Sequence, residues 1–385
     1  MIRETLLPYG RQFIDEDDIS AVVDVLRSPL ITTGPKCREF EEAIAKYTGV
    51  EYAVAVSNGT AALHAACYAA GIGEGDEVIT TAITFAASAN AVLYCGGTPV
   101  FADIDAKTYN IDPEDIRRKI TDKTKAIIPV HFTGQPCEMD EIMKIAEEFN
   151  LVVIEDGAHV LGSEYKGEKI GCRGDMQTVS FHPVKHITTG EGGVILTNNK
   201  DFYDKMMLFR THGITRDEKL LNRNEGRWYY EQLDLGYNFR ITDIQCALGI
   251  SQLKKLDGFL EKRRALVGYY NELLKDVDGI ITPYQSEDAN SSWHLYIIKL
   301  DSQLVGNCRK EVFDELWKRN IGANVHYIPV YYHPYYQGLG YEKGLCPIAE
   351  ELYDNMITLP LFTQMTEADV EYVVKNLKEI VGKYK

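Results

Sequence analysis

Short apolar segments alternate with amphipathic segments of helical length over the first 200 residues, and this alternation is what most constrains the fold. Most of the apolar segments are rich in β-branched residues and lack the polar–apolar alternation of a half-exposed strand. Strands of this kind are buried on both faces, as in mainly parallel sheets covered by helices. Seven strands are expected, at residues 52–57, 77–80, 98–104, 125–130, 151–155, 177–181 and 193–197. The sequence therefore predicts an α/β fold with a mainly parallel, seven-stranded sheet.

Helical periodicity fills the spaces between the early strands. Two amphipathic helices are expected before the first strand, at 16–27 and 36–47, with Asp15 as the N-cap of the first. Further helices are expected at residues 60–70, 86–95, 112–119 and 138–149. In open sheets with helical crossovers, ligands bind at the carboxyl ends of the strands, so candidate site residues are sought there.

The pattern changes near residue 250. After this point we expect a long charged helical stretch, a strand and two more helices, at residues 251–275, 293–299, 308–319 and 366–382. We therefore predict a large domain over residues 1–250, which includes the N-terminal helices, and a smaller C-terminal α+β domain over residues 251–385.

Charge and cysteine content exclude several classes of partner and site. The formal net charge is −16, which argues against nucleic acid or an anionic membrane as a partner. The eight cysteines are scattered without metal-ligand spacing, as expected for reduced thiols in a cytoplasmic protein, and no metal site is expected. No apolar stretch reaches about 18 residues, so neither a signal peptide nor a membrane span is expected.

One lysine lies in an unusual context, in the loop between the last two expected strands. Lys185 belongs to the segment Ser-Phe-His-Pro-Val-Lys-His-Ile, which begins at Ser180 and leads into a glycine-rich turn. An earlier buried strand ends in Asp156. A lysine can bond covalently to the aldehyde of pyridoxal phosphate, a strand-end carboxylate can keep the ring nitrogen protonated, and a serine can contact the phosphate. Crowding would also lower the pKa of Lys185 and let it act as a general base.

Other candidate contacts lie at the same edge of the expected sheet. Gly59 and Thr60 open a helix directly after a strand, which is the geometry of a phosphate seat, although a plain strand-to-helix turn explains them equally well. Phe85 follows the next strand and is suited to stack on a planar ring, or else belongs to the core. His159, three residues after Asp156, can hydrogen-bond the ring substituents.

Two later segments carry polar and aromatic groups. Asn238 and Arg240 lie just before a helix and can serve an anion, although a capped helix start explains the same segment. Residues 325–336 hold five tyrosines and two histidines, a composition that suits a sugar or a nucleobase. His326 and Tyr327 are the candidate substrate contacts there. A dimer surface or a domain interface accounts for the same cluster.

Taken together, these segments resemble the DegT/DnrJ/EryC1/StrS family of sugar aminotransferases, which are fold-type I pyridoxal phosphate enzymes. The resemblance covers nearly the whole chain. It is carried by the segments LITTGP, SNGTAALHAA, GDEVITT, PVHFTGQPCEMD, IEDGAH, SFHPVK, ITTGEGG, GYNFRITDIQ and VHYIP, in this order. The resemblance implies an aspartate aminotransferase-like fold, pyridoxal 5'-phosphate as cofactor and a homodimer with a shared active site.

The resemblance also implies individual roles. Lys185 would be the lysine that bonds to the cofactor, and Asp156 the partner of the ring nitrogen. Phe85 would cover the ring face, and His159 stands where many members have a glutamine that contacts the ring oxygen. In the dehydratase branch of the family a histidine replaces the lysine, so the presence of Lys185 favours aminotransfer over dehydration.

Phosphate binding is implied for Gly59, Thr60 and Ser180, while Asn238 would reach the phosphate in the neighbouring subunit. Within the family the resemblance is strongest to the branch that serves pseudaminic acid biosynthesis. That branch aminates C4 of a UDP-4-keto-6-deoxy-N-acetylhexosamine, with glutamate as the donor. Another nucleotide 4-ketosugar as acceptor, or a pyridoxal phosphate-dependent sugar dehydratase of the same fold, are the alternatives.

Overall fold

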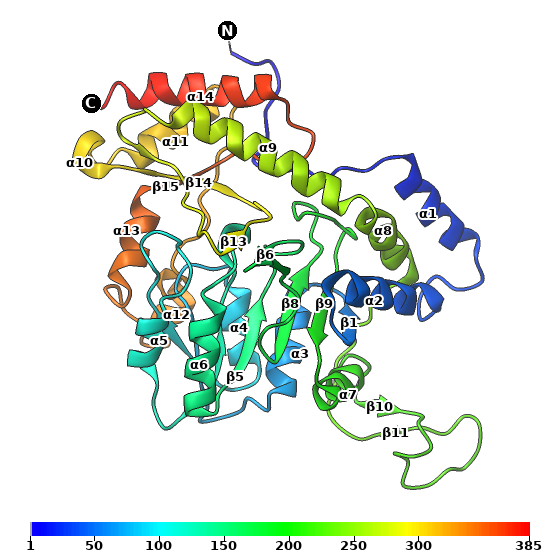
Figure 1. The fold of residues 1–385 in the computed structure, drawn as a ribbon. Helices are drawn as coiled ribbons and strands as arrows, with labels where there is room; N and C mark the ends of the chain where they lie inside the picture. The colour runs from blue at the N-terminus through cyan, green and yellow to red at the C-terminus, as the bar shows by residue number, and fades with distance from the viewer. Residues whose placement is uncertain (1) are drawn as a thin grey trace.

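A seven-stranded sheet lies at the centre of the computed structural model, which describes residues 2–385 (Figure 1). The strand order is β1-β9-β8-β5-β4-β2-β3, and only β9 runs antiparallel to its neighbours. The strands are β1 (Tyr52–Val56), β2 (Glu77–Thr81), β3 (Thr98–Ala102), β4 (Thr124–Ile128), β5 (Val152–Asp156), β8 (Met176–Ser180) and β9 (Gly193–Thr197). The predicted fold class is confirmed, and each predicted strand overlaps one of these seven.

Helices cover both faces of this sheet, which is why its strands are apolar throughout. Side chains on one face of β1, such as Val54, pack with helices α3, α4 and α7. Ala53 and Ala55, on the other face, pack with α2 and α8. Farther along the sheet, α5 and α6 cover that second face. The helices are α1 (Glu16–Arg27), α2 (Pro35–Thr48), α3 (Gly59–Ala69), α4 (Ala87–Tyr94), α5 (Pro113–Lys119), α6 (Met139–Phe149), α7 (Lys200–Phe209) and α8 (Asp243–Leu253). The capping of α1 by Asp15 is confirmed.

A second core lies around a small antiparallel sheet in the C-terminal third. Its strand order is β12-β14-β15, and helices α9, α11 and α14 pack on it. The C-terminal end of the chain follows α14 (Figure 1), and Leu7 from the N-terminal segment pairs with Ile321 and enters this core. The elements are α9 (Leu256–Leu274), β12 (Ile280–Ile281), β14 (Tyr296–Leu300), α11 (Arg309–Lys318), β15 (Met356–Leu359) and α14 (Glu367–Val381). The domain boundary at residue 250 stays a prediction.

The helical stretch predicted over 251–275 is divided in the structure. Helix α8 ends at Leu253, and α9 begins at Leu256. At the break, the ammonium group of Lys255 forms ion pairs with Asp15 and Asp18 of the N-terminal segment. Because this contact joins residues far apart in the sequence, the local helical pattern gives no sign of the break.

The remaining elements are short. A hairpin formed by β10 and β11 projects from the body of the molecule (Figure 1). None of the helices between residues 2 and 385 has the length and apolar character needed to cross a membrane. The short elements are η1 (Phe132–Gly134), β6 (Glu164–Tyr165), β7 (Glu168–Lys169), β10 (Ile214–Thr215), β11 (Glu231–Gln232), β13 (Ala289–Asn290), α10 (Ser302–Val305), η2 (Val330–Tyr332), α12 (Pro334–Gly338) and α13 (Pro347–Asn355).

Candidate active site

A cavity of about 860 Å³ opens at the carboxyl ends of the central strands. Asp156 and Ser180 are the last residues of β5 and β8, and Gly59 begins the helix that follows β1. Nine of the ten site residues expected from the sequence line this cavity: Gly59, Thr60, Phe85, Asp156, His159, Ser180, Lys185, His326 and Tyr327. The tenth, Asn238, is exposed and lies outside the cavity lining of this chain.

One end of the cavity has the geometry of a phosphate seat. Asn58 caps α3, its side chain accepting a hydrogen bond of 2.8 Å from the amide of Ala61. The first amides of a helix have no partner within it and lie at its positive end. A Cβ atom on Gly59 would lie only 3.0 Å from Cβ of Ser180, so glycine allows these two segments to approach closely. The backbone and the Ser180 hydroxyl can therefore bind one anion together.

Asp156 lines the cavity and is held there by hydrogen bonds. The carboxylate is buried, and it accepts a hydrogen bond of 2.7 Å from the Ser88 hydroxyl and one of 3.1 Å from the amide of Ala158. The backbone of Asp156 pairs with Pro129 and His131 of the adjoining segment. A carboxylate anchored in this way can bind a cationic ring nitrogen without reorganising.

Lys185 also lines the cavity, and its environment makes the amine unusually easy to deprotonate. Burial lowers the pKa of Lys185 to about 8, and the negative charge of Asp156 opposes this shift. The amide of Lys185 donates to the carbonyl of His182 at 2.9 Å, so the residue lies in a tight turn. An amine with this pKa is available at neutral pH both as a nucleophile and as a proton carrier.

Three histidines of the cavity lining lie close enough to Lys185 to sense its charge. His159 is 3.3 Å from the Tyr327 hydroxyl through Nε2, and its ring is 4.3 Å from that of His294, centroid to centroid. The ring of His326 is held by Thr358. Burial and the charge of Lys185 lower the pKa of His159 and His294 well below the usual value, and that of His326 to about 3. These imidazoles are neutral at physiological pH.

Phe85 lies at the mouth of the cavity. Its side chain is 62% exposed, and its ring centroid is 6.2 Å from that of Tyr327. An aromatic face this open is free to stack on a planar ligand. The alternative placement of Phe85 in the core is wrong.

Sequence reasoning missed three residues at this site. Tyr9 and His294 line the cavity, and Ser88 holds Asp156. Tyr9 lies far from any recognised motif, and His294 lies in a segment that reads as an ordinary strand. Ser88 follows Phe85 by three residues in α4, and helical spacing from Phe85 was the one local signal that pointed to it.

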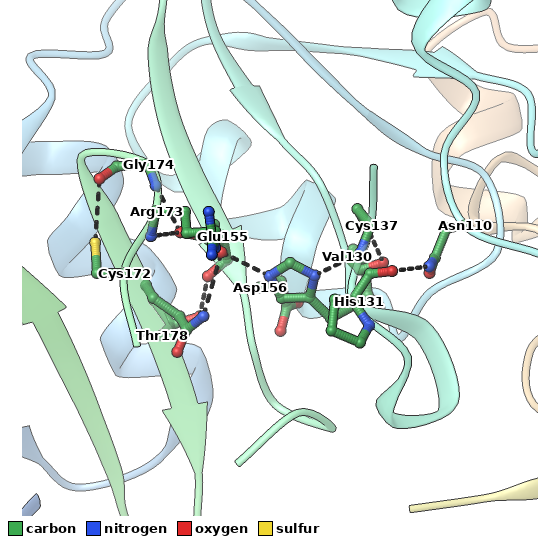
Figure 2. Close-up of polar contacts among 12 residues, drawn as sticks. Asn110, Val130, His131, Cys137, Glu155, Asp156, Cys172, Arg173, Gly174 and Thr178 are labelled. Carbon is green, nitrogen blue, oxygen red and sulfur yellow. Dashed lines mark hydrogen bonds and ion pairs between the residues drawn. The ribbon is translucent and has the colours of Figure 1, made fainter. Parts of the chain in front are cut away.

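A second polar network lies behind β5 (Figure 2). The buried carboxylate of Glu155 accepts hydrogen bonds from the amides of Arg173 and Gly174, at 2.6 and 2.7 Å, and pairs with Nε2 of His131 at 2.7 Å. Nδ1 of His131 accepts from the amide of Cys137 at 3.0 Å. The proton of this imidazole therefore lies on Nε2 and is donated to Glu155.

Comparison with known proteins identifies the family. The model of the DegT/DnrJ/EryC1/StrS aminotransferase family matches residues 12–378. The chain belongs to this family. The expected family and its fold-type I architecture are thus confirmed, and the chain is a sugar aminotransferase of the DegT type.

Three relatives illustrate the similarity. The chain is 40% identical to the spore coat polysaccharide biosynthesis protein SpsC of Bacillus subtilis, over 98% of each chain. It superposes on PseC of Helicobacter pylori, an aminotransferase of pseudaminic acid biosynthesis, with a TM-score of 0.92 and 33% identity, over 99% of this chain and 100% of that one. The chain also superposes on the pyridoxal phosphate form of the putative sugar aminotransferase Spr1654 of Streptococcus pneumoniae. The TM-score is 0.91 and the identity 33%, over 99% of this chain and 100% of that one.

Proposed function

We propose that this protein is a pyridoxal phosphate-dependent aminotransferase that moves the amino group of glutamate to C4 of a UDP-4-keto-6-deoxy-N-acetylhexosamine, as in pseudaminic acid biosynthesis. The observation that carries the proposal is the shared cavity of Lys185 and Asp156, where a desolvated amine faces an anchored carboxylate. The similarity to PseC supports the choice of acceptor.

The residues of the cavity fit the cofactor. Pyridoxal phosphate, when bound, supplies an aldehyde that takes up the amino group and a ring that withdraws electrons from the reacting carbon. Gly59, Thr60 and Ser180 would bind its phosphate at the positive end of α3. The unpartnered Nδ1 atom of His159 is a buried polar group that a ring substituent would satisfy. The pyridoxal phosphate form of Spr1654 supports this cofactor.

Three residues would carry the reaction. Lys185 would hold the cofactor covalently, and after release it would move a proton between the amino donor and the cofactor, because its amine is neutral in a large fraction of molecules near pH 8. Asp156 would keep the ring nitrogen protonated and orient the ring. Phe85 would cover one face of the ring and keep water away from it.

Substrate binding and assembly follow from the remaining residues. His326 and Tyr327 would contact the substrate, since both line the cavity. Asn238 is exposed and outside the cavity of its own chain, which supports a role in the site of a neighbouring subunit. The active protein would then be a homodimer with shared sites, and cytoplasmic, as the sequence predicts.

A different nucleotide 4-ketosugar is the second candidate acceptor. Identity to SpsC, at 40%, exceeds the 33% to PseC, and SpsC serves the biosynthesis of a polysaccharide. The reaction would be the same, with a different sugar or nucleotide. No such observation favours a dehydratase, since the lysine is present at residue 185.

The proposal is tested by loading the protein with pyridoxamine phosphate and adding a panel of UDP- and dTDP-4-ketosugars. We expect the UDP-4-keto-6-deoxy-N-acetylhexosamine to abolish the absorbance of the pyridoxamine form, and an aminosugar product to appear in the mass spectrum. Preference for another sugar would replace the acceptor with the second candidate. If glutamate failed to convert the pyridoxal form of the protein to the pyridoxamine form, aminotransfer from glutamate would be rejected.

A further inference from the structure

His294 is a buried polar side chain that the roles above do not use. It is only 4% exposed, it lines the cavity, and its Nδ1 atom has no hydrogen-bond partner among the residues that the structure describes. Nδ1 of the neighbouring His159 is also buried and unpartnered. The cofactor ring would satisfy Nδ1 of His159, but it leaves Nδ1 of His294 without a partner. Leaving a buried polar group unsatisfied costs about 1–3 kcal/mol, so Nδ1 of His294 indicates a further ligand that satisfies it.

Charge indicates that this ligand is an anion. Arg263 of α9 is fully buried, and its Nη1 donates only to backbone carbonyls, those of Trp293, His294 and Leu361. No carboxylate within residues 2–385 forms an ion pair with it. Burial lowers the pKa of Arg263 to about 10, so it is still charged at pH 7. An unpaired buried cation behind His294 favours negative charge in front of it.

The cavity offers few other partners for such an anion. No arginine belongs to the described lining, and Lys185 is its one lysine. Lys185 is needed for bond formation and proton transfer, so it cannot also hold a carboxylate. Hydroxyl groups such as that of Tyr9 and neutral imidazoles remain, and each imidazole can donate one N–H to an oxygen atom. His294 and His159 lie within the electrostatic reach of Lys185, and both line the cavity.

Given the proposed aminotransfer from glutamate, on which this assignment rests, we infer that His294 binds the α-carboxylate of the amino donor. The donor must bring its Cα next to the Lys185 amine, so its carboxylate lies within a few ångströms of that amine. His294 donates to one carboxylate oxygen, and His159 lies beside it. The field of Arg263 strengthens this hydrogen bond without direct contact.

The test is binding of glutarate, an unreactive dicarboxylate, to the pyridoxal phosphate-loaded protein by calorimetry. His294→Phe keeps an aromatic ring and removes both nitrogens, and glutarate affinity is expected to fall about ten-fold or more. His294→Gln keeps a donor and is expected to retain most of the affinity. His333→Phe serves as a matched control, because His333 lies outside the cavity lining. Glutaramide, which has no carboxylate, is expected to bind wild type and His294→Phe equally weakly.

Cofactor affinity separates ligand binding from a structural role. If His294 binds the donor, the dissociation constant of pyridoxal phosphate stays within about two-fold of wild type in His294→Phe, while the KM for glutamate rises. The half-reaction of the pyridoxamine form with the ketosugar keeps its rate. A parallel loss of cofactor and glutarate affinity would overturn the assignment, since His294 would then only position His159. Unchanged glutarate affinity would overturn it as well.

A second measurement needs no apolar variant. Glutarate added to wild-type protein with ¹⁵N-labelled histidine is expected to shift the ring resonances of His294, which are identified by their loss in His294→Gln. No shift at saturating glutarate would contradict the assignment. The proposed function fails separately: if glutamate produces no pyridoxamine form while glutarate still depends on His294, the carboxylate site stands and the donor is a different amino acid.

Discussion

Two neighbouring carboxylates on β5 face opposite sides of the sheet and have opposite surroundings. The carboxylate of Glu155 accepts hydrogen bonds from the amides of Arg173 and Gly174 and from His131 (Figure 2). It accepts a further one from the side-chain amide of Gln177. Asp156 has two donors and otherwise faces the cavity. The hydrogen-bonding capacity of Glu155 is used within the protein, so this residue can only hold the chain in place. Asp156, on the cavity side, has hydrogen-bonding capacity left for a ligand.

The same contrast extends beyond β5. On the cavity side, Lys185 has a lowered pKa, and His159 and His294 have unpartnered nitrogens. Leaving these groups without partners lowers the stability of the fold. Such a loss of stability is expected at sites where a ligand restores the missing contacts. Substitutions on the two sides should therefore separate activity from stability.

Lys185→Ala should have the largest effect. Removing the amine removes both the covalent link to the cofactor and the proton carrier, so kcat is expected to fall by about 10⁴-fold. The unfolding midpoint of the cofactor-free protein should not fall, because the variant no longer buries an amine. Steady-state kinetics and denaturation curves measure the two quantities. Turnover within ten-fold (about 1.4 kcal/mol) of wild type would remove Lys185 from the reaction.

Asp156→Asn is expected to lower kcat by about 10²–10³-fold with little loss of stability. An asparagine can still accept from Ala158, and its amide can donate to the Ser88 hydroxyl, so the local hydrogen bonds survive. What is lost is the negative charge opposite the ring nitrogen. Steady-state kinetics with saturating cofactor test this. An equal loss of stability and activity would mean that Asp156 is as structural as Glu155.

These two residues were predictable because their signals are local. Asp156 ends an apolar β-branched run, and Lys185 lies in a short loop between two such runs, and both line the cavity at the carboxyl ends of the strands. His294 was not predictable, because its segment reaches the cavity through a contact with Thr133, far away in the sequence. The break between α8 and α9 was missed for the same reason, since its ion pairs are long-range.

The pKa of Lys185 gives the next prediction. The neutral amine attacks the cofactor aldehyde, so the rate of pyridoxal phosphate uptake by the cofactor-free protein should rise with pH and level off above about 8. Below that value the rate should fall about ten-fold per pH unit, as the neutral fraction does. Stopped-flow absorbance at several pH values measures the profile. An exposed lysine would instead show a midpoint above 10.

Asp156→Asn should move this midpoint downward, because the carboxylate opposes the effect of burial on Lys185. The shift provides an internal check on the distance between the two groups. A midpoint that did not move would mean that the charge of Asp156 does not act on Lys185. The two groups would then not work together on the cavity side of β5.

Glu155→Gln should affect stability and leave the chemistry nearly intact. The new amide would replace the oxygen that faces His131 and Gln177, and both of these are donors. His131 cannot reverse its tautomer, because its Nδ1 atom accepts from Cys137. Two opposed donors in a buried site are expected to cost about 2–3 kcal/mol of unfolding free energy. Urea denaturation measures this, with the exposed Glu148→Gln, at about 0–1 kcal/mol, as the control.

The kcat of Glu155→Gln shows whether Glu155 serves stability alone or the reaction as well. At a temperature where Glu155→Gln is folded, its kcat should stay within a few-fold of wild type, because the backbone of Asp156 is still held by Pro129 and His131 through main-chain hydrogen bonds. A stable Glu155→Gln protein with a kcat as low as that of Asp156→Asn would contradict the comparison. The network behind β5 would then tune the charge of Asp156 through the strand, and the two faces would act as one site.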